Sequence, residues 1–138
     1  MVAYACRFEP APPGHVVTCR DLPVVTWGET LPEGMAMAAD AIATVLSDMP
    51  PGDWPKPSPA QPGEVVVTLL PLLAAKTALW SAMVDAGVSR SELARRLGCD
   101  EKEVRRLLSF KHRSQIDRVA TALACLGKRL VVDLEDAA

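Results

Sequence analysis

The chain has 138 residues, of which 49% are apolar and only 4% aromatic, so we expect a packed core built mainly from Val, Leu, Ala and Met. The longest nearly apolar run, residues 65–75, is too short for a membrane span. No secretion signal opens the chain, so a cytoplasmic, reducing location is expected. The net charge of −2 hides an asymmetry, because residues 1–71 sum to −5 and residues 72–138 to +3. This split favours two partners of opposite charge.

The first half of the sequence predicts a small sheet followed by a helix. Two short stretches, residues 2–10 and 14–19, are rich in β-branched or alternating apolar residues and are separated by Pro and Gly, which predicts a β-hairpin. Residues 24–30 predict a third strand. Thr30 and Glu33 form a capping-box pattern that opens a helix running to about Asp48. The residues expected to face the sheet are Met35, Ala38, Ala39, Ile42, Val45, Leu46 and Met49.

A proline-rich tract and an apolar strand follow this helix. Residues 49–64 hold six of the twelve prolines, a composition typical of an extended connection. The next stretch, EVVVTLLP, predicts a buried strand that needs the earlier strands as partners. We therefore expect the tract to be a crossover loop inside a first domain, residues 1–71, with the order β-β-β-α-β.

Helical periodicity replaces the strand pattern in the second domain, residues 72–138. Three further helices are bounded by capping residues and glycines: one between Ser89 and Gly98, one after Asp100, and one ending at Gly127. The first helix of this domain ends at Gly87, and one side of it carries Leu72, Leu73, Leu79, Trp80, Met83 and Val84. The final stretch, RLVVDL, predicts a short C-terminal strand. The expected fold class is α+β, with a mainly helical second half.

The stretch VSRSELARRLGCDEKEVRRLL, residues 88–108, meets the requirements of a helix-turn-helix. Ala94 is small enough for two helices to cross closely, Gly98 supplies the turn, and Leu93 and Val104 provide apolar anchors on the two helices. Residues 88–118 also carry a net charge of +4, which suits phosphate binding. The alternative is an αα-hairpin that serves packing only.

Nine residues are the candidate DNA contacts. The N-terminal turn of the second helix should enter the major groove, where Lys and Arg reach guanine or phosphates and Glu accepts from cytosine. The start of the first helix and the basic loop after the second suit phosphate binding. Stabilising the helix dipole is the alternative role for the acids of the second helix. The candidates are Ser89, Arg90, Glu101, Lys102, Arg105, Arg106, Lys111, His112 and Arg113.

No catalytic, metal or cofactor site is expected. The sequence has no CxxC pair, its two histidines are nearly a hundred residues apart, and His15 has no nucleophile in a matching pattern. The acids of the first half show no paired spacing, so we interpret them as solvated or as an acidic face for a basic partner. Reduced cysteines that fill packing positions are favoured over disulfides for Cys6, Cys19, Cys99 and Cys125.

The order of these motifs resembles the HicB antitoxin family. That family's pattern is strand, glycine, strand, an acid-Leu-Pro turn, then a Thr, a Gly and an acid before a capped helix. The matching positions are Gly14, Asp21, Leu22, Pro23, Thr26, Gly28, Glu29, Thr30, Leu31 and Glu33. The helix-turn-helix half and the KRLVV ending are similar to the branch of the family with this DNA-binding type, so the resemblance spans essentially the whole chain.

The resemblance implies a partial RNase H-like first domain and a lambda-repressor-like second domain. It implies that the first domain masks a HicA-type toxin, a small basic mRNA interferase, and that a homodimer or higher even oligomer binds operator DNA. The implied toxin-binding residues are Phe8, Glu9, His15, Asp21, Leu22 and Pro23. Two alternatives stay open: a stand-alone transcriptional regulator whose first domain senses a ligand or dimerises, and a nuclease that uses the RNase H-like half.

Overall fold

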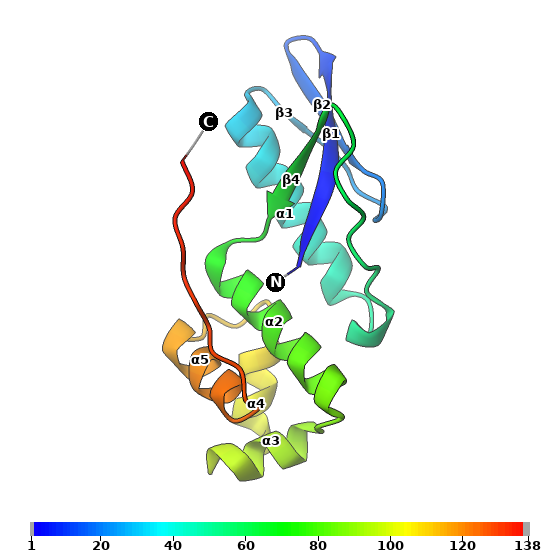
Figure 1. Ribbon diagram of the computed structural model, residues 1–138. Helices are drawn as coiled ribbons and strands as arrows, with labels where there is room; N and C mark the ends of the chain where they lie inside the picture. Colours follow the sequence, from blue (N-terminus) through cyan, green and yellow to red (C-terminus); the bar gives the residue numbers. More distant parts are fainter. Residues whose placement is uncertain (1, 137–138) are drawn as a thin grey trace.

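A four-stranded antiparallel sheet with one long helix forms the first half of the molecule, and four helices form the second (Figure 1). The structure is a computed structural model that describes residues 2–136. The strands lie in the order β3-β2-β1-β4. Both the α+β class and the predicted β-β-β-α-β order are confirmed by the elements β1 (Ala3–Ala11), β2 (Gly14–Cys19), β3 (Val25–Gly28), α1 (Leu31–Ser47), η1 (Pro51–Asp53), β4 (Glu64–Thr68), α2 (Pro71–Ala86), α3 (Arg90–Leu97), α4 (Glu101–Leu108) and α5 (Ile116–Ala124).

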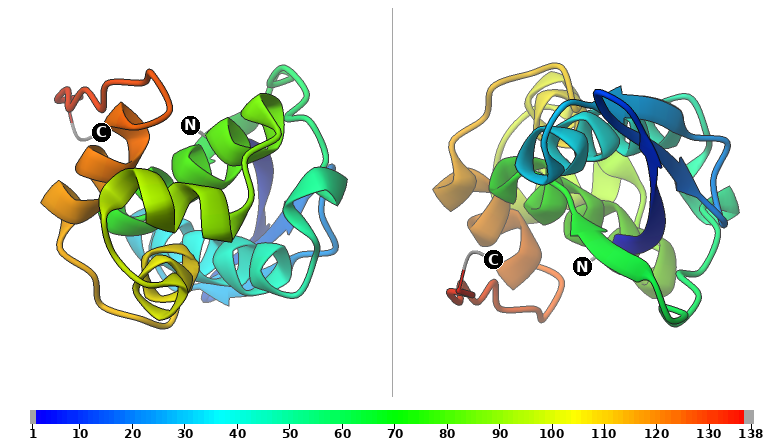
Figure 2. Two further views of the ribbon diagram at one scale, coloured as in Figure 1. Left: turned by 90° about the horizontal axis from the view of Figure 1, so that it is seen from below. Right: turned by 90° about the horizontal axis from the view of Figure 1, so that it is seen from above.

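The first core lies between the sheet and α1, which covers one face of it (Figure 2). β1 pairs with β2 on one side and with β4 on the other, so its side chains on the α1 face are enclosed by both neighbours. Each fully buried aliphatic side chain contributes roughly 1.5–3 kcal/mol relative to exposure. The side chains of this core with the least exposure include Tyr4, Cys6, Val17, Val67, Ala38, Ile42 and Leu46.

Two glycines set the distance between β3 and α1. The predicted N-cap is confirmed, since the Glu33 amide donates to Thr30 Oγ1 over 3.2 Å. A Cβ on Gly28 would lie 2.3 Å from the nitrogen of Gly34 and 2.5 Å from its Cα. Gly34 therefore faces the sheet, and Met35 is turned outward with 38% of its surface exposed. The prediction that Met35 faces the sheet is wrong because this close approach sets the helix phase.

Replacing Gly28 by Ala should destabilise the fold by roughly 3 kcal/mol or more, because the atoms that the new methyl group meets are backbone and cannot turn aside. Urea unfolding followed by tryptophan fluorescence measures the change. Gly52→Ala is the matched control, because nothing lies within 4 Å of a Cβ placed there. Equal unfolding midpoints for the two variants would contradict the close approach.

The proline-rich tract, residues 49–63, connects α1 to β4 and is tied to the first half at several points. The Tyr4 hydroxyl donates to the carbonyl of Pro55 over 2.7 Å. The Ser58 amide and hydroxyl both donate to the carboxylate of Asp21 over 2.8 Å. These bonds hold the tract against the sheet end, as expected for a crossover loop within this half.

Helix α2 contributes to two cores. Leu73 and Ala74 near its start belong to the first core, and Ala75, Leu79 and Met83 belong to a second core built with the later helices. Because α2 is enclosed on several sides, its buried residues do not follow one stripe. Val84, which the sequence predicted to face inward, is 51% exposed, so that prediction is wrong. Lys76 and Thr77 are fully buried instead.

The C-terminal segment, residues 128–136, is extended but is not a strand (Figure 1). Within residues 2–136, no backbone hydrogen bond pairs residues 129–133 with another segment. A strand requires a partner for its backbone groups, and the described part of a single chain supplies none here. The predicted strand over residues 129–134 is therefore wrong for one copy of the chain.

Candidate functional site

The turn between α3 and α4 has the local geometry that the sequence predicted. Ser89 caps α3 by accepting from the Glu92 amide over 3.1 Å, and Asp100 caps α4 by accepting from the Glu103 amide over 2.9 Å. Gly98 ends α3 with a φ of 70°, a left-handed conformation that favours glycine. Ala94 is buried, 5% exposed, where α3 meets its neighbours. Two short helices thus leave this turn with capped starts.

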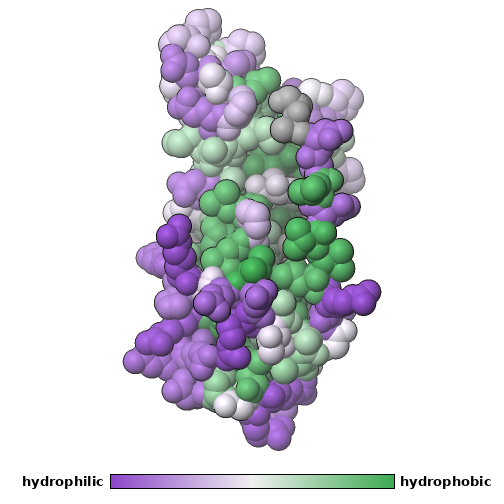
Figure 3. Space-filling view, turned by 90° about the vertical axis from the view of Figure 1, so that its left-hand side faces the viewer, coloured by the Kyte–Doolittle hydropathy of each residue, from purple (hydrophilic) through white to green (hydrophobic). Residues whose placement is uncertain are grey.

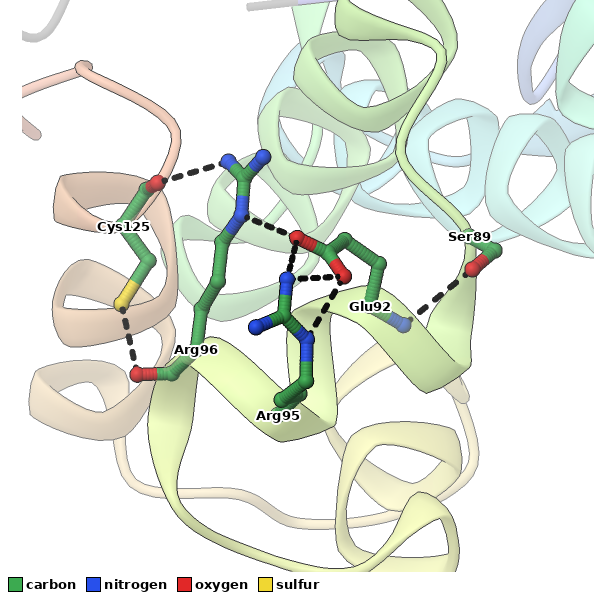
Figure 4. Close-up of polar contacts among 5 residues, drawn as sticks. All are labelled: Ser89, Glu92, Arg95, Arg96 and Cys125. Atoms are coloured by element: carbon green, nitrogen blue, oxygen red, sulfur yellow. Dashed lines mark hydrogen bonds and ion pairs between the residues drawn. The ribbon is translucent and has the colours of Figure 1, made fainter.

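Three of the nine cations in residues 88–118 form ion pairs, two of them within α3 and one between α4 and α5. The Glu92 carboxylate accepts from Arg95 over 2.6 Å and from Arg96 over 3.0 Å. Arg96 also donates to the carbonyl of Cys125 at the end of α5 over 3.3 Å (Figure 4). Arg118 of α5 pairs with Glu103 of α4. These three arginines have structural partners, and one of the acids of α4 is used to bind α5.

The other six cations of this stretch are exposed and form no ion pair within residues 2–136. They lie at the start of α3, on α4 and in the loop after α4. All six are among the predicted DNA contacts: Arg90, Lys102, Arg105, Arg106, Lys111 and Arg113. The positive charge of this region is therefore concentrated on one helix and its flanking segments, available to an anionic partner.

The structure brings most of these predicted contacts to common surface depressions. One groove is lined by Lys102, Arg105, Arg106, Ser109, Lys111 and His112. Arg113 shares an adjoining groove with Lys102, Arg106 and His112, and Arg90 shares a cavity with Arg105 and Lys111. Glu101 is exposed on α4 but lines none of these hollows, and the Ser89 hydroxyl is used as a helix cap. Each of the six cations thus lines at least one of these three hollows, which share residues and are also lined by Asp48, Asp100 and Glu103.

A buried lysine holds the C-terminal end of α4 and the loop after it. Lys76 of α2 is fully buried, and its ammonium donates to the carbonyls of Arg106, Ser109 and His112 over 3.1, 2.6 and 2.7 Å. It also donates to Ser114 Oγ over 3.0 Å. Burial lowers the pKa of Lys76 to about 8, and within residues 2–136 the lysine forms no ion pair. We call this arrangement the Lys76 clasp, and the sequence did not predict it.

The predicted toxin-binding residues occupy different environments. Leu22 is 4% exposed in the first core. The carboxylate of Asp21 accepts hydrogen bonds from the amide and from the hydroxyl of Ser58. These two bonds, the amide's above all, hold the pKa of Asp21 below its ordinary value. Pro23 and Glu9 are exposed, and Phe8 and His15 are partly buried on neighbouring strands. Asp21 and Leu22 thus support the loop, while the other four residues are accessible at least in part.

The acids of the first half are distributed over its surface. Glu64 is the one that forms an ion pair within residues 2–136, and the hydrogen bonds from Arg20 lower its pKa to about 2. Six others are exposed: Glu9, Glu29, Glu33, Asp40, Asp48 and Asp53. This half therefore carries net negative charge on its exposed surface, as the charge count suggested.

Comparison with known proteins identifies the family. No protein-family model matches the chain. Antitoxin HicB of Pseudomonas fluorescens (strain Pf0-1) is 37% identical over 145 residues, which cover 99% of this chain and 97% of that protein. The chain belongs to the HicB antitoxin family. Antitoxin HicB 2 of Photorhabdus laumondii is 37% identical over 92% of both chains, and Antitoxin HicB of Escherichia coli K12 is 34% identical over 92% of this chain and 95% of its own.

These HicB relatives support an antitoxin role and a toxin as partner, and they point to a regulatory protein rather than an enzyme. Three of the positions that resembled HicB have a clear structural reason. Gly28 allows the close approach to α1, and Thr30 caps that helix. A Cβ on Gly14 would lie 2.3 Å from the carbonyl oxygen of Gly28. The HicB pattern in the first half is thus partly a set of packing requirements.

The four cysteines of this HicB protein are free thiols, as the sequence favoured. Cys6 and Cys19 lie opposite each other on β1 and β2 and are buried, and burial raises the pKa of the Cys6 thiol to about 12. In residues 2–136, no three metal-ligating side chains of the His, Cys, Asp and Glu types converge. The helices of this same range lack the length and apolar character that crossing a membrane requires.

Proposed function

We propose that this chain neutralises a HicA-type toxin, a small basic mRNA interferase, and represses its own operon by binding operator DNA. In this proposal the acidic first unit, partly RNase H-like, covers the toxin. The second unit, a lambda-repressor-like helix-turn-helix, binds DNA as a homodimer or a higher even oligomer. The names of the relatives support the antitoxin part.

The observation that carries the DNA-binding part is the set of six unpaired cations on α3, α4 and the loop after α4. Ion pairs use the remaining cations of residues 88–118 within the fold. Six exposed cations that are close in the sequence and have no ion pair within the described residues suit a partner with regularly spaced phosphates. The acidic first unit suits a toxin that must itself be basic to hold RNA, because opposite charges steer association.

Two measurements test the two parts separately. Where a small basic gene lies beside this one, calorimetry of the full chain with the purified product of that gene should give tight binding, and the chain should stop this product's cleavage of RNA. Gel shifts with DNA from its own promoter should show binding that resists an excess of unrelated DNA and weakens steeply with salt. No heat of binding would overturn the antitoxin part, and no preference for promoter DNA would overturn the repressor part.

A second candidate function, a regulator that senses a small ligand, is favoured by one cavity. The cavity has a volume of about 330 Å³ and lies where the first unit meets the helix-turn-helix. Its lining includes three aromatic side chains and three of the unpaired cations: Trp54, Trp80, Phe110, Arg90, Arg105 and Lys111. This lining would suit a small aromatic anion. Operator binding by the purified chain that depends on an added metabolite would favour this candidate.

A further inference from the structure

The C-terminal segment, residues 128–136, carries exposed apolar side chains and free backbone groups. Val131 is 64% exposed, Val132 78% and Leu134 92%. In the described range the single backbone hydrogen bond donated from residues 129–136 is a local one, from Leu134 to the carboxylate of Asp133. An extended, β-branched and apolar segment whose backbone groups are unpaired can pair with another strand.

This segment lies beside an apolar surface of the second half. It shares a cavity with Leu69, Pro71, Ala74 and Ile116, which come from the start of α2 and its flanks and from the start of α5. Figure 3 views this side of the molecule and shows apolar side chains gathered across the middle, with polar surface above and below. Apolar surface of this kind is typical of a protein interface.

The charges of the segment are arranged so that two antiparallel copies of it would place opposite charges next to each other. Two cations, Lys128 and Arg129, precede the apolar residues, and three acids, Asp133, Glu135 and Asp136, follow or interrupt them. None of these five forms an ion pair within residues 2–136. If two copies run antiparallel with Val132 opposite Val132, the facing pairs are Lys128 with Asp136, Arg129 with Glu135, Leu130 with Leu134, and Val131 with Asp133. A parallel pair would instead set like charges side by side.

The same register also places the leucines and Val132 on one face of the ribbon and the Arg129–Glu135 pairs on the other. Because strand side chains alternate, Leu130, Val132 and Leu134 of both copies share one face. Arg129 and Glu135 share the other face and pair across the strands. The two-fold axis passes between the two Val132 residues, as an interface formed by the same patch on both copies requires.

We propose that residues 128–136 of two copies of this chain pair as an antiparallel β-ribbon in the register centred on Val132. The ribbon gives the homodimer of the proposed function its contact and rests on that dimer forming. It supplies the backbone partner that the predicted C-terminal strand lacks within one copy. It also joins the two helix-turn-helix units directly after α5, which suits the binding of two half-sites.

Charge exchange at Arg129 and Glu135 tests the register. In full-length chain, Arg129→Glu or Glu135→Arg sets like charges opposite each other twice per dimer, so each variant should weaken dimerisation roughly 10-fold in sedimentation experiments. The double variant, Arg129→Glu with Glu135→Arg, should return to within roughly 3-fold of the unchanged chain. The control for altered net charge is Asp117→Arg, because Asp117 is an exposed acid on α5.

A second measurement does not depend on charge. The paired Val132 residues would have Cα atoms about 4.5–5.5 Å apart, which suits a disulfide. Val132→Cys should therefore give a dimer whose peptides are joined at position 132 in mass spectrometry under oxidation, whereas Leu134→Cys, which faces Leu130, should not join to itself. Dimers that are insensitive to charge exchange and lack the 132 link would overturn the ribbon but not the dimer. A chain that remains a monomer would overturn both.

Discussion

Lys102→Glu and Arg105→Glu are each expected to weaken binding to promoter DNA by roughly 10-fold or more, and the double variant by roughly 100-fold or more. Both side chains are exposed on α4, line the same groove and have no internal ion pair within the described residues. Reversing a charge removes a phosphate or base contact and adds repulsion from the duplex. Fluorescence anisotropy with labelled promoter DNA measures the affinity at several salt concentrations.

The control for these variants is Arg95→Glu, which reverses a charge in the same region but on a side chain that already pairs with Glu92. Its effect on DNA affinity should be much smaller. Binding of the toxin should be unchanged in Lys102→Glu and Arg105→Glu, because both lie in the second half. Full DNA affinity in both variants would exclude α4 as the reading helix, and equal loss in all three would show only a dependence on net charge.

Lys76→Met should destabilise the protein by about 3 kcal/mol and loosen the loop that carries Lys111 and Arg113. Methionine fills a similar volume but leaves the carbonyls of Arg106, Ser109 and His112 without their donor. Each unpaired buried acceptor costs roughly 1–3 kcal/mol, offset in part because no ammonium needs to be desolvated. Urea unfolding measures the stability, and amide hydrogen exchange measures the loop.

Lys56→Met is the matched control for the clasp, since Lys56 is exposed in the proline-rich tract and its loss should leave both readouts unchanged. In Lys76→Met, amides of residues 109–114 should exchange faster, while those of β1 and β2 keep their order of protection. Unchanged exchange in that loop would show that the ammonium does not hold it.

The clasp should also give a defined pH dependence. The pKa of Lys76 in the folded protein is about 8, below the value of roughly 10.4 of an unfolded chain. Unfolding therefore takes up a proton between these two values, so this group's contribution to the free energy of unfolding rises with pH across that window and is constant below it. The stability difference between the unchanged chain and Lys76→Met should widen above pH 8, and a constant difference would contradict the lowered pKa.

Local sequence signals were sufficient for most of the fold. The caps at Thr30, Ser89 and Asp100 and the stops at Gly87 and Gly98 depend on neighbours only a few residues away, and all five are confirmed. The membership of β4 in the same sheet as the earlier strands also followed from one requirement, that an apolar strand after the proline tract needed partners. The candidate DNA contacts on α4 were found for the same reason, because the helical periodicity of the apolar residues shows which charged residues of that helix are exposed.

The features that the sequence did not predict depend on contacts between distant segments. Met35 is exposed because Gly28 and Gly34 meet across β3 and α1, and no local pattern encodes that contact. Lys76 resembles a surface lysine until α4 and its loop are placed against α2. The strand over residues 129–134 was predicted from composition alone, and composition does not supply a partner.

The position of α2 in both cores has a consequence for how the molecule unfolds. If the chain lost its second half, Leu73 and Ala74 would no longer cover the first core. If it lost its first half, the start of α2 and Phe110, whose ring lies 6.1 Å from that of Trp54, would be exposed to water. The two halves should therefore melt in one cooperative transition, so that a toxin bound to the sheet would also protect the distant DNA-contacting helices from proteases.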